Sequence, residues 1–279
     1  MPVAKLPDVE LYYEVHGEGV PLVWCHPFGD DHRCWELQVR HFGRLYKCIA
    51  YNHRGYPPSS QPPNQDDYSP QILLKDLVGL LDHLEIDRAH FVGISMGGAV
   101  VRSLAQRHPE RCISAVVAGA GTGSEDPEEH KRIIEEAVAV IHNSGMEAFA
   151  SYYLDNVSHR TLQRKDPLGW EQFRARFAAN NPDFVVNSQR GIRGYRAPVA
   201  ARAGALAEMK VPLLLLVGDH DEAALEPMLA AYRAIPIASL GVLPNSGHPI
   251  NIEEPALFNS MVETFLRRVE SGAWHASLE

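Results

Sequence analysis

Ser95 has the sequence surroundings of a reactive residue. It stands in the pattern Gly93-Ile94-Ser95-Met96-Gly97, after the apolar residues 89–92 and before a helix-like stretch over residues 96–107. A strand, a tight turn and a helix in this order form a nucleophile elbow, which lifts the serine hydroxyl above the sheet edge. The free N–H groups of the helix would favour negative charge that develops there. The segment predicts a catalytic serine; the alternative is a serine tucked into an ordinary tight turn.

A serine hydroxyl needs a neighbouring base, and His248 is a candidate for that role. It lies in Asn245-Ser246-Gly247-His248-Pro249, directly after an apolar stretch over residues 237–243 that reads as a strand. Of the fourteen histidines, it is the one that follows a late strand through a short loop containing glycine. An imidazole can take a proton near neutral pH. The alternative is a loop histidine that only satisfies backbone groups.

The third expected group is a carboxylate that orients the histidine. The apolar stretch over residues 211–217 ends at Gly218-Asp219-His220-Asp221, and catalytic groups gather at the carboxyl ends of parallel strands. Such a carboxylate holds the imidazole in one tautomer and stabilises the imidazolium. From the residues themselves, both Asp219 and Asp221 are candidates. The order serine, aspartate, histidine is the order found on α/β-hydrolase sheets.

These motifs resemble the α/β-hydrolase superfamily, in its cap-bearing branch of esterases, lactonases and C–C bond hydrolases. The resemblance covers nearly the whole chain and implies Ser95 as the nucleophile and His248 as the general base. It implies Asp221 as the acid in preference to Asp219, which would brace the loop. It also implies an oxyanion hole formed by the backbone N–H groups of Phe28 and Met96.

The loop expected to carry Phe28 departs from the family pattern. His26-Pro27-Phe28-Gly29 resembles the family's H-G-x-G loop, with Pro27 in place of a glycine. Proline has no N–H to donate, but the N–H of Phe28 remains available. Two donors aimed at one oxygen would each contribute about 3 kcal/mol to transition-state stabilisation. The alternative is an ordinary strand-to-helix turn.

Two other polar stretches are interpreted as structural. Asn52-His53-Arg54-Gly55-Tyr56-Pro57-Pro58-Ser59-Ser60 resembles the family's D-x-R-G-x-G-x-S loop, with asparagine replacing the aspartate and Pro58 replacing the second glycine. Asp30-Asp31-His32 has the composition of a metal site, but adjacent residues do not readily converge on one ion. No metal is predicted.

Strands and helices alternate along the chain in a way that would position these groups. Residues 9–15 alternate like an edge strand, and short apolar runs predict buried strands over residues 21–25, 46–51 and 112–118. Helices are predicted over residues 32–42, 70–84 and 255–269. This alternation predicts an α/β fold with a parallel sheet. The resemblance implies a mostly parallel eight-stranded sheet flanked by helices.

The strand signal disappears between about residues 122 and 206. Helix-like blocks cover residues 127–142, 146–156 and 167–179. The family carries a helical cap at this place, so we expect a core of residues 1–121 and 207–279 with a cap of residues 122–206. Aromatic side chains of the cap, together with the residue after the histidine, are expected to line the substrate pocket, packing among the cap helices being the alternative: Phe149, Tyr153, Trp170 and Pro249.

Composition narrows the class of partner. The 279 residues are 45% hydrophobic and carry a net charge of −9, from 26 basic and 35 acidic side chains, without a basic stripe. Nucleic acid and anionic membrane surfaces are therefore not expected as partners. The four cysteines have no C-x-x-C spacing, and the N-terminus lacks the form of a signal peptide. We expect a cytoplasmic monomer or homodimer.

The predicted activity is hydrolysis of a carboxylic ester or lactone of a small, largely apolar substrate, through an acyl-enzyme on Ser95 and without a cofactor. A serine at the elbow excludes the ester intermediate on aspartate that dehalogenases and epoxide hydrolases of this family use. C–C bond cleavage, amide hydrolysis and perhydrolysis remain alternatives with the same triad. Pro249 stands where C–C hydrolases often carry tryptophan. A ligand-binding receptor with slow turnover is an alternative of another class.

Overall fold

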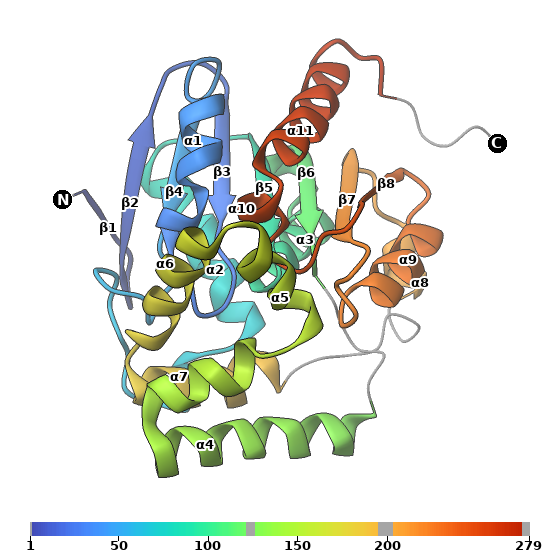
Figure 1. Ribbon diagram of the computed structural model, residues 1–279. Coiled ribbons are helices and arrows are strands. Elements are labelled where there is room, and N and C mark those ends of the chain that lie inside the picture. Colours follow the sequence, from blue (N-terminus) through green and yellow to red (C-terminus); the bar gives the residue numbers. More distant parts are fainter. Residues whose placement is uncertain (1, 121–125, 195–202, 275–279) are drawn as a thin grey trace.

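The centre of the molecule is an eight-stranded sheet, seen in a computed structural model that describes residues 2–120, 126–194 and 203–274 (Figure 1). The spatial order of the strands is β1-β2-β4-β3-β5-β6-β7-β8. β1 pairs with β2 and β2 with β4 in antiparallel fashion, and the remaining pairs are parallel. The strands are β1 (Val3–Lys5), β2 (Glu10–His16), β3 (Pro21–Cys25), β4 (Lys47–Tyr51), β5 (Ala89–Ile94), β6 (Cys112–Ala118), β7 (Leu213–Gly218) and β8 (Ala238–Leu243). The predicted fold class is confirmed.

The strands form where short apolar runs are bounded by turn residues. β5 and β7 are buried at every position, as strands covered on both faces must be. β7 begins two residues later than expected. Pro212, just before it, has no N–H to donate to the ladder, which favours a start beyond the proline. β1 was not predicted, since three residues are too few to show an alternating pattern.

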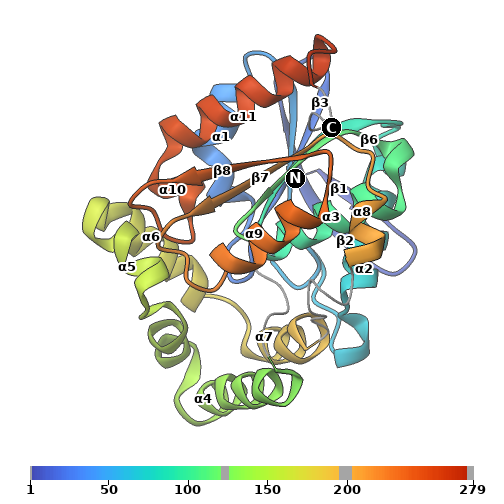
Figure 2. The ribbon, with the colours of Figure 1, turned by 90° about the vertical axis from the view of Figure 1, so that its right-hand side faces the viewer.

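Helices cover both faces of the sheet (Figure 2). One face carries α1, α10 and α11, whose apolar side chains meet Trp24 and Trp35 in one core cluster. The other face carries α2, α3, α8 and α9 over a second, larger cluster. Their bounds are α1 (Glu36–Phe42), α2 (Pro70–His83), α3 (Met96–Arg107), α8 (Ala203–Ala207), α9 (Leu225–Ala234), α10 (Ile250–Glu253) and α11 (Pro255–Glu270), with one-turn helices η1 (His32–Trp35), η2 (Gln65–Asp67) and η3 (Pro109–Arg111).

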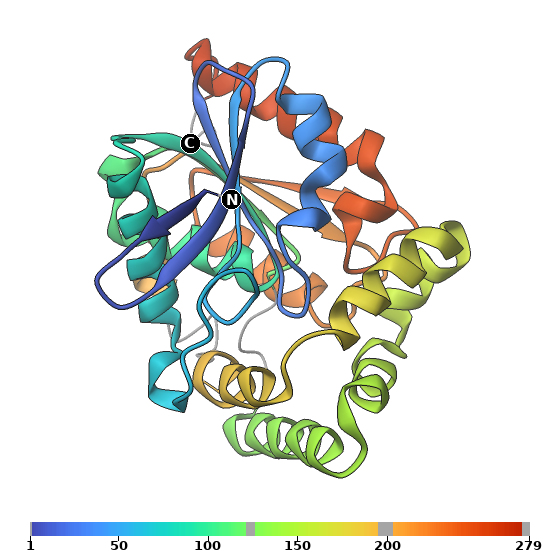
Figure 3. The same ribbon diagram turned by 90° about the vertical axis from the view of Figure 1, so that its left-hand side faces the viewer.

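An all-helical insertion follows β6, as predicted, and lies beyond one end of the sheet (Figures 1 and 3). It contains α4 (Pro127–Leu154), α5 (Val157–Lys165), α6 (Pro167–Ala178), α7 (Pro182–Ser188) and the π-helical turn η4 (Gln189–Arg193). Two predicted blocks form the single α4, which is kinked at Gly145 (φ 76°). α5 and α7 were not predicted, because nine and seven residues give too few turns for a clear helical period.

The expected limits of the cap remain a proposal. The limit between residues 121 and 122 lies outside the described residues. The limit between residues 206 and 207 falls within α8, which packs on α9 of the core. This packing favours placing α8 with the core.

Two further findings concern the whole described chain. None of the helices in the described ranges, the 28-residue α4 included, has the length of apolar sequence that a membrane crossing needs. The four cysteines, Cys25, Cys34, Cys48 and Cys112, are all free and buried.

Candidate active site

Ser95 occupies a sharp turn between β5 and α3. Its backbone has φ 55° and ψ −115°, a conformation unfavourable for a residue with a Cβ atom. The Ser95 N–H donates to the carbonyl of Ala118 on β6 at 2.8 Å. The flanking glycines are sterically required, since a Cβ on Gly93 would lie 2.4 Å from the Gly97 carbonyl oxygen and a Cβ on Gly97 would lie 2.1 Å from that of Cys25. The turn therefore holds the serine in a strained, fixed position.

A histidine and a carboxylate meet in the loops that follow β7 and β8. Nδ1 of His248, which follows β8, lies 2.6 Å from Oδ2 of Asp221, which follows β7. Asp221 is 1% exposed. Because this carboxylate accepts the Nδ1 proton, the Nε2 atom of the neutral ring is left to act as a base.

Asp219, the other candidate carboxylate, has a different partner. Its Oδ1 accepts the N–H of Ser246 at 2.9 Å, which braces the loop that carries His248. Burial acts to raise the pKa of Asp219, but hydrogen bonds from the backbone of Asn245 and Ser246 outweigh it and hold this pKa below its usual value. Of the two carboxylates, the one that contacts the histidine is Asp221.

Ser95 and His248 line two adjoining cavities. The first is enclosed and has a free volume of about 20 Å³, room for a single water molecule. The second opens to the surface and has about 280 Å³. Tyr153 and His159 of the cap lie between the two and line both.

The loop after β3 presents its backbone to the enclosed cavity. The His53 N–H donates to Nε2 of His26 at 3.0 Å, so the proton of this ring lies on Nδ1 and is donated to the Pro27 carbonyl at 2.8 Å. Because a trans peptide directs its C=O and N–H to opposite sides, the N–H of Phe28 points away from the His26 ring. Pro27 and Phe28 line the enclosed cavity together with Ser95. Among the described residues, none accepts a hydrogen bond from the N–H of Phe28 or of Met96.

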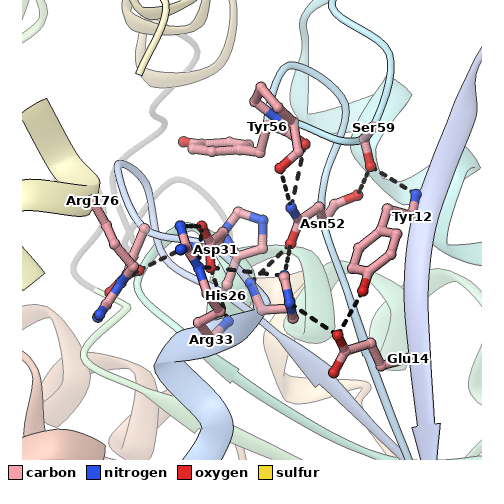
Figure 4. Close-up of polar contacts among 12 residues, drawn as sticks. Tyr12, Glu14, His26, Asp31, Arg33, Asn52, Tyr56, Ser59 and Arg176 are labelled. Carbon is pink, nitrogen blue, oxygen red and sulfur yellow. Dashed lines mark hydrogen bonds and ion pairs between the residues drawn. The ribbon is translucent and has the colours of Figure 1, made fainter. Parts of the chain in front are cut away.

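A buried polar network connects the loop after β3 to the loop after β4 (Figure 4). The asparagine that replaces the family's aspartate, Asn52, uses both halves of its amide: Oδ1 accepts the His32 N–H at 2.9 Å, and Nδ2 donates to the Pro57 carbonyl at 2.8 Å. The Tyr56 hydroxyl accepts the Gly29 N–H at 2.9 Å. Asn52 thus ties together the two loops that follow β3 and β4.

Helix α6 of the cap is fastened to the same loop. Arg176 forms two hydrogen bonds with the buried carboxylate of Asp30, at 2.6 and 2.9 Å, and Asn180 donates to the Gly29 carbonyl at 2.9 Å. Gly29 has φ 81°, and a Cβ there would lie 2.1 Å from the ring of Phe177. The absence of a side chain on this residue lets the phenylalanine of the cap close over the loop.

Helix α5 braces the histidine loop in a similar way. The Ser158 carbonyl accepts the backbone N–H of His248 at 2.6 Å. Oε2 of Glu253 accepts the Gly247 N–H at 3.0 Å and the Thr161 hydroxyl at 2.9 Å. The cap therefore contacts both loops that carry the candidate catalytic groups.

The structure divides the four predicted pocket residues into two pairs. Tyr153 and Pro249 line the enclosed cavity. Phe149 and Trp170 do not belong to the described walls of either cavity. Phe149 is fully buried behind Tyr153, with ring centroids 5.6 Å apart, and Trp170 packs on Phe173 at 6.1 Å. For this pair, packing among the cap helices is what the structure shows.

His159 and Arg193 are among the cavity residues that the sequence did not predict. Nδ1 of His159 donates to Oδ1 of Asn156 at 3.0 Å, and the His159 ring centroid lies 5.5 Å from that of His248. Burial, followed by the nearby charge of His248, lowers the pKa of His159 to about 3, so its ring is neutral at pH 7. Both residues stand in polar stretches of the cap, and no local sequence signal distinguishes them.

Acid should destabilise the protein through its buried neutral histidines. Burial lowers the pKa of His26 and of His90 to about 4, as it lowers that of His159 to about 3. In the unfolded chain these rings titrate near 6.5, so the unfolded state binds more protons below that pH. Their contribution is complete above pH 6.5 and is lost as the pH falls towards 4. At pH 5 each should cost about 2 kcal/mol of unfolding free energy relative to pH 7.5, measurable by urea denaturation.

A variant isolates one of these contributions. His90→Gln removes a titrating ring far from Ser95 while keeping a group that can bond Ser114, the present partner of Nδ1 at 2.7 Å. The difference in unfolding free energy between pH 7.5 and pH 5 should shrink by up to about 2 kcal/mol in this variant, because Oε1 of Glu270, 3.3 Å from Nε2 of His90, favours the charged ring and acts against burial. The exposed His142→Gln change is the matched control and should leave the difference unchanged. An undiminished difference in His90→Gln would refute the linkage.

The polar triplet after the loop does not converge. Asp30 pairs with Arg176, Asp31 with Arg33, and His32 with Asn52. Among the described residues, no group of three or more His, Cys, Asp or Glu side chains is arranged to hold a metal ion.

Known proteins share this architecture over most of their length. The chain is 28% identical over 274 residues to 3-oxoadipate enol-lactonase 2 of Acinetobacter baylyi, with 94% of each chain covered. It is similar to the solved structure of an enol-lactonase from Burkholderia xenovorans, with a TM-score of 0.85 and 26% identity over 95% of this chain and 100% of the other. Est816, described as an N-acyl homoserine lactone degrading enzyme, gives a TM-score of 0.81 and 30% identity with the same coverage.

A family model described as "alpha/beta hydrolase fold" matches residues 20–255. The match includes every strand from β3 to β8 and each of the residues Ser95, Asp221 and His248. Sheet order, elbow and family model agree, and the chain belongs to the alpha/beta hydrolase fold family.

Proposed function

We propose that the protein is a serine hydrolase that cleaves a carboxylic ester or lactone through an acyl-enzyme on Ser95. One observation carries the proposal: His248 lies 2.6 Å from a buried Asp221 carboxylate and lines the same two cavities as the strained Ser95. Such a histidine activates a serine hydroxyl and later protonates a leaving group.

The reaction follows from these roles. The Ser95 oxygen bonds to the acyl carbon while its proton passes to Nε2 of His248, and the carbonyl electron pair moves onto oxygen. The N–H groups of Phe28 and Met96 donate to this oxyanion. When the carbonyl re-forms, the bond to the alcohol oxygen breaks and that oxygen takes the proton from His248. Water, deprotonated by the same histidine, then releases the acid by the same two steps.

The walls of the site support a small substrate. Apolar side chains of the cap, Phe173 and Phe177, form the enclosed cavity together with Ile252 of the core. Because two of the relatives are named as lactonases, we favour an ester or a lactone over the other bonds that such a triad can cleave. Each role assigned to the triad, to the oxyanion donors and to Tyr153 and Pro249 is part of this proposal.

A panel of p-nitrophenyl esters from acetate to decanoate tests both the activity and the pocket. Because the enclosed cavity has room for about one water molecule, and so for no more than about a methyl group, we expect kcat/KM to be highest for acetate and at least about tenfold lower for decanoate. A parallel panel of five- and six-membered lactones, followed by pH-stat titration, separates lactonase from open-chain esterase activity. A folded protein that releases acid from no ester or lactone would contradict the proposal.

One variant connects the chain-length preference with the cavity. Phe173→Ala removes a wall of the enclosed cavity and should move the optimum towards longer acyl chains. Tyr152→Ala removes an aromatic ring from the same cap at a position that is 46% exposed, and it should leave the optimum unchanged. An optimum that stays at short chains in Phe173→Ala would show that another wall limits the acyl group.

A further inference from the structure

The larger cavity contains a positive charge that the proposed reaction does not use. Arg193, the last residue of η4, lines this cavity beside Ser95 and His248. Its Nη1 donates to Gln189 Oε1 at 2.6 Å. Among the described residues, its buried Nε has no hydrogen-bond partner and no carboxylate lies in ion-pair distance of the guanidinium.

The other arginines of the cap helices differ from Arg193. Five of the six form ion pairs with carboxylates: Arg132, Arg160, Arg174, Arg176 and Arg190. The sixth, Arg164, is exposed to solvent. A half-buried cation without a counter-ion is unfavourable, because burial removes water that nothing in the protein replaces. Glu222 lines the same cavity, but it is exposed and forms no ion pair with Arg193. The missing partner of Arg193 is therefore not a neighbouring carboxylate of the described chain.

The guanidinium is also held in position. Its Cζ atom lies 5.1 Å from the ring centroid of Tyr153 and 5.9 Å from that of Phe28, distances at which cation–π attraction acts. The Arg193 carbonyl accepts a hydrogen bond from His130 Nε2 at 2.7 Å, which fixes the backbone. A fixed guanidinium loses little entropy on binding, and its planar fork matches the two oxygens of a carboxylate.

We propose that Arg193 binds a carboxylate group of the substrate, so that the enzyme prefers esters or lactones that carry a second, unreacted carboxylate. This inference rests on the proposed function, since it assigns the substrate class of the same site. A carboxylate suits the cavity better than a doubly charged phosphate, because Asp221 and Glu222 already add negative charge to the wall. The carboxylate belongs to the part of the substrate that occupies the larger cavity.

Two matched pairs of substrates test this preference on either side of the scissile bond. Mono-p-nitrophenyl glutarate against p-nitrophenyl valerate places the carboxylate on the acyl group, and 4-acetoxybenzoate against 4-acetoxybenzamide places it on the alcohol. In at least one pair, Arg193→Gln should lower kcat/KM for the charged member about 10- to 100-fold, the range for a hydrogen bond between charged groups. It should leave the neutral member within about threefold. Arg193→Lys keeps the charge but loses the planar pair of N–H donors, so its kcat/KM for the charged member should lie between those of the wild type and of Arg193→Gln.

The control is Arg190→Gln, which changes an arginine of the same turn whose charge pairs with Glu135 at 2.7 Å, away from both cavities. It should alter neither member of either pair. Equal losses for charged and neutral esters in Arg193→Gln would show a packing role and overturn the proposal. A wild type that hydrolyses the neutral esters but shows no preference for a charged one would also overturn it, while leaving the proposed function intact.

A binding measurement keeps the two proposals separable if no ester turns over. Glutarate should raise the unfolding temperature of the wild type and of Ser95→Ala, and should not raise that of Arg193→Gln. This result would support the carboxylate site without any catalysis. An equal shift in Arg193→Gln, or no shift in the wild type, would count against it.

Discussion

Replacing Ser95 by alanine should lower kcat for p-nitrophenyl butyrate on the order of 10⁶-fold, as loss of a triad serine does. The alanine side chain has no oxygen that could form the acyl-enzyme. Within the described residues, the strained turn between β5 and α3 offers no second hydroxyl at this position. Residual turnover would come from the oxyanion donors and from substrate binding. The measurement is the initial rate at saturating ester, with circular dichroism to show that the variant is folded.

A covalent inhibitor tests directly whether Ser95 is the nucleophile. An organophosphate such as diethyl p-nitrophenyl phosphate should release one equivalent of p-nitrophenolate from the wild type and leave its phosphoryl group on the peptide that contains Ser95. Ser95→Ala should release none. Ser103→Ala, on the helix that follows the turn, is the matched control and should react like the wild type. Full activity in Ser95→Ala would remove the proposed mechanism.

Replacing Asp221 by asparagine should lower kcat about 10⁴-fold while KM changes little. An amide in this place donates to the ring instead of accepting from it, so the Nδ1 proton that now lies 2.6 Å from Oδ2 moves to Nε2. The Nε2 atom can then no longer accept the serine proton. Steady-state kinetics across pH separate this loss in kcat from a loss in binding.

Asp219→Asn is the comparison that decides between the two carboxylates. Asp219 is exposed and accepts backbone N–H groups of the loop, among them that of Ser246, which an amide oxygen can still accept. The change should therefore weaken the loop only slightly and reduce kcat by less than about tenfold. If both variants lost activity equally, the loop as a whole rather than the Asp221 carboxylate would be responsible.

Local sequence was sufficient for the framework of this protein. The apolar runs that form β3, β5, β6 and β7 are recognisable because a strand covered on both faces must be apolar along its length. The elbow around Ser95 has a local signature, since a Cβ on Gly93 would meet the backbone of Gly97 and Gly98 in the same turn. Gly97, in contrast, is required by the backbone of Cys25 on β3, far away in the sequence. Composition and motif order were enough to predict the class of fold.

The structure of the cap was less predictable from local sequence. The two short helices α5 and α7 were missed, and the aromatic residues of the cap were known only as a group. Which of them reach the cavity depends on how the cap helices pack: Tyr153 faces it, whereas Phe149, one helical turn before, lies behind. Residues four apart on a helix share a face, so the spacing of Phe149 and Tyr153 does not indicate which of them reaches the cavity.

The sequence by itself determined the parallel sheet, the turn that carries Ser95 and the positions of two loops with candidate partners for it. Only the tertiary structure decided which carboxylate meets His248, that Arg176 pairs with Asp30 across 146 residues, and that Arg193 lines the cavity without a counter-ion among the described residues. The physical reason is the distance along the sequence over which each property is determined. Backbone conformation and burial pattern follow from neighbouring residues, whereas a hydrogen bond or an uncompensated charge depends on side chains that only packing brings together.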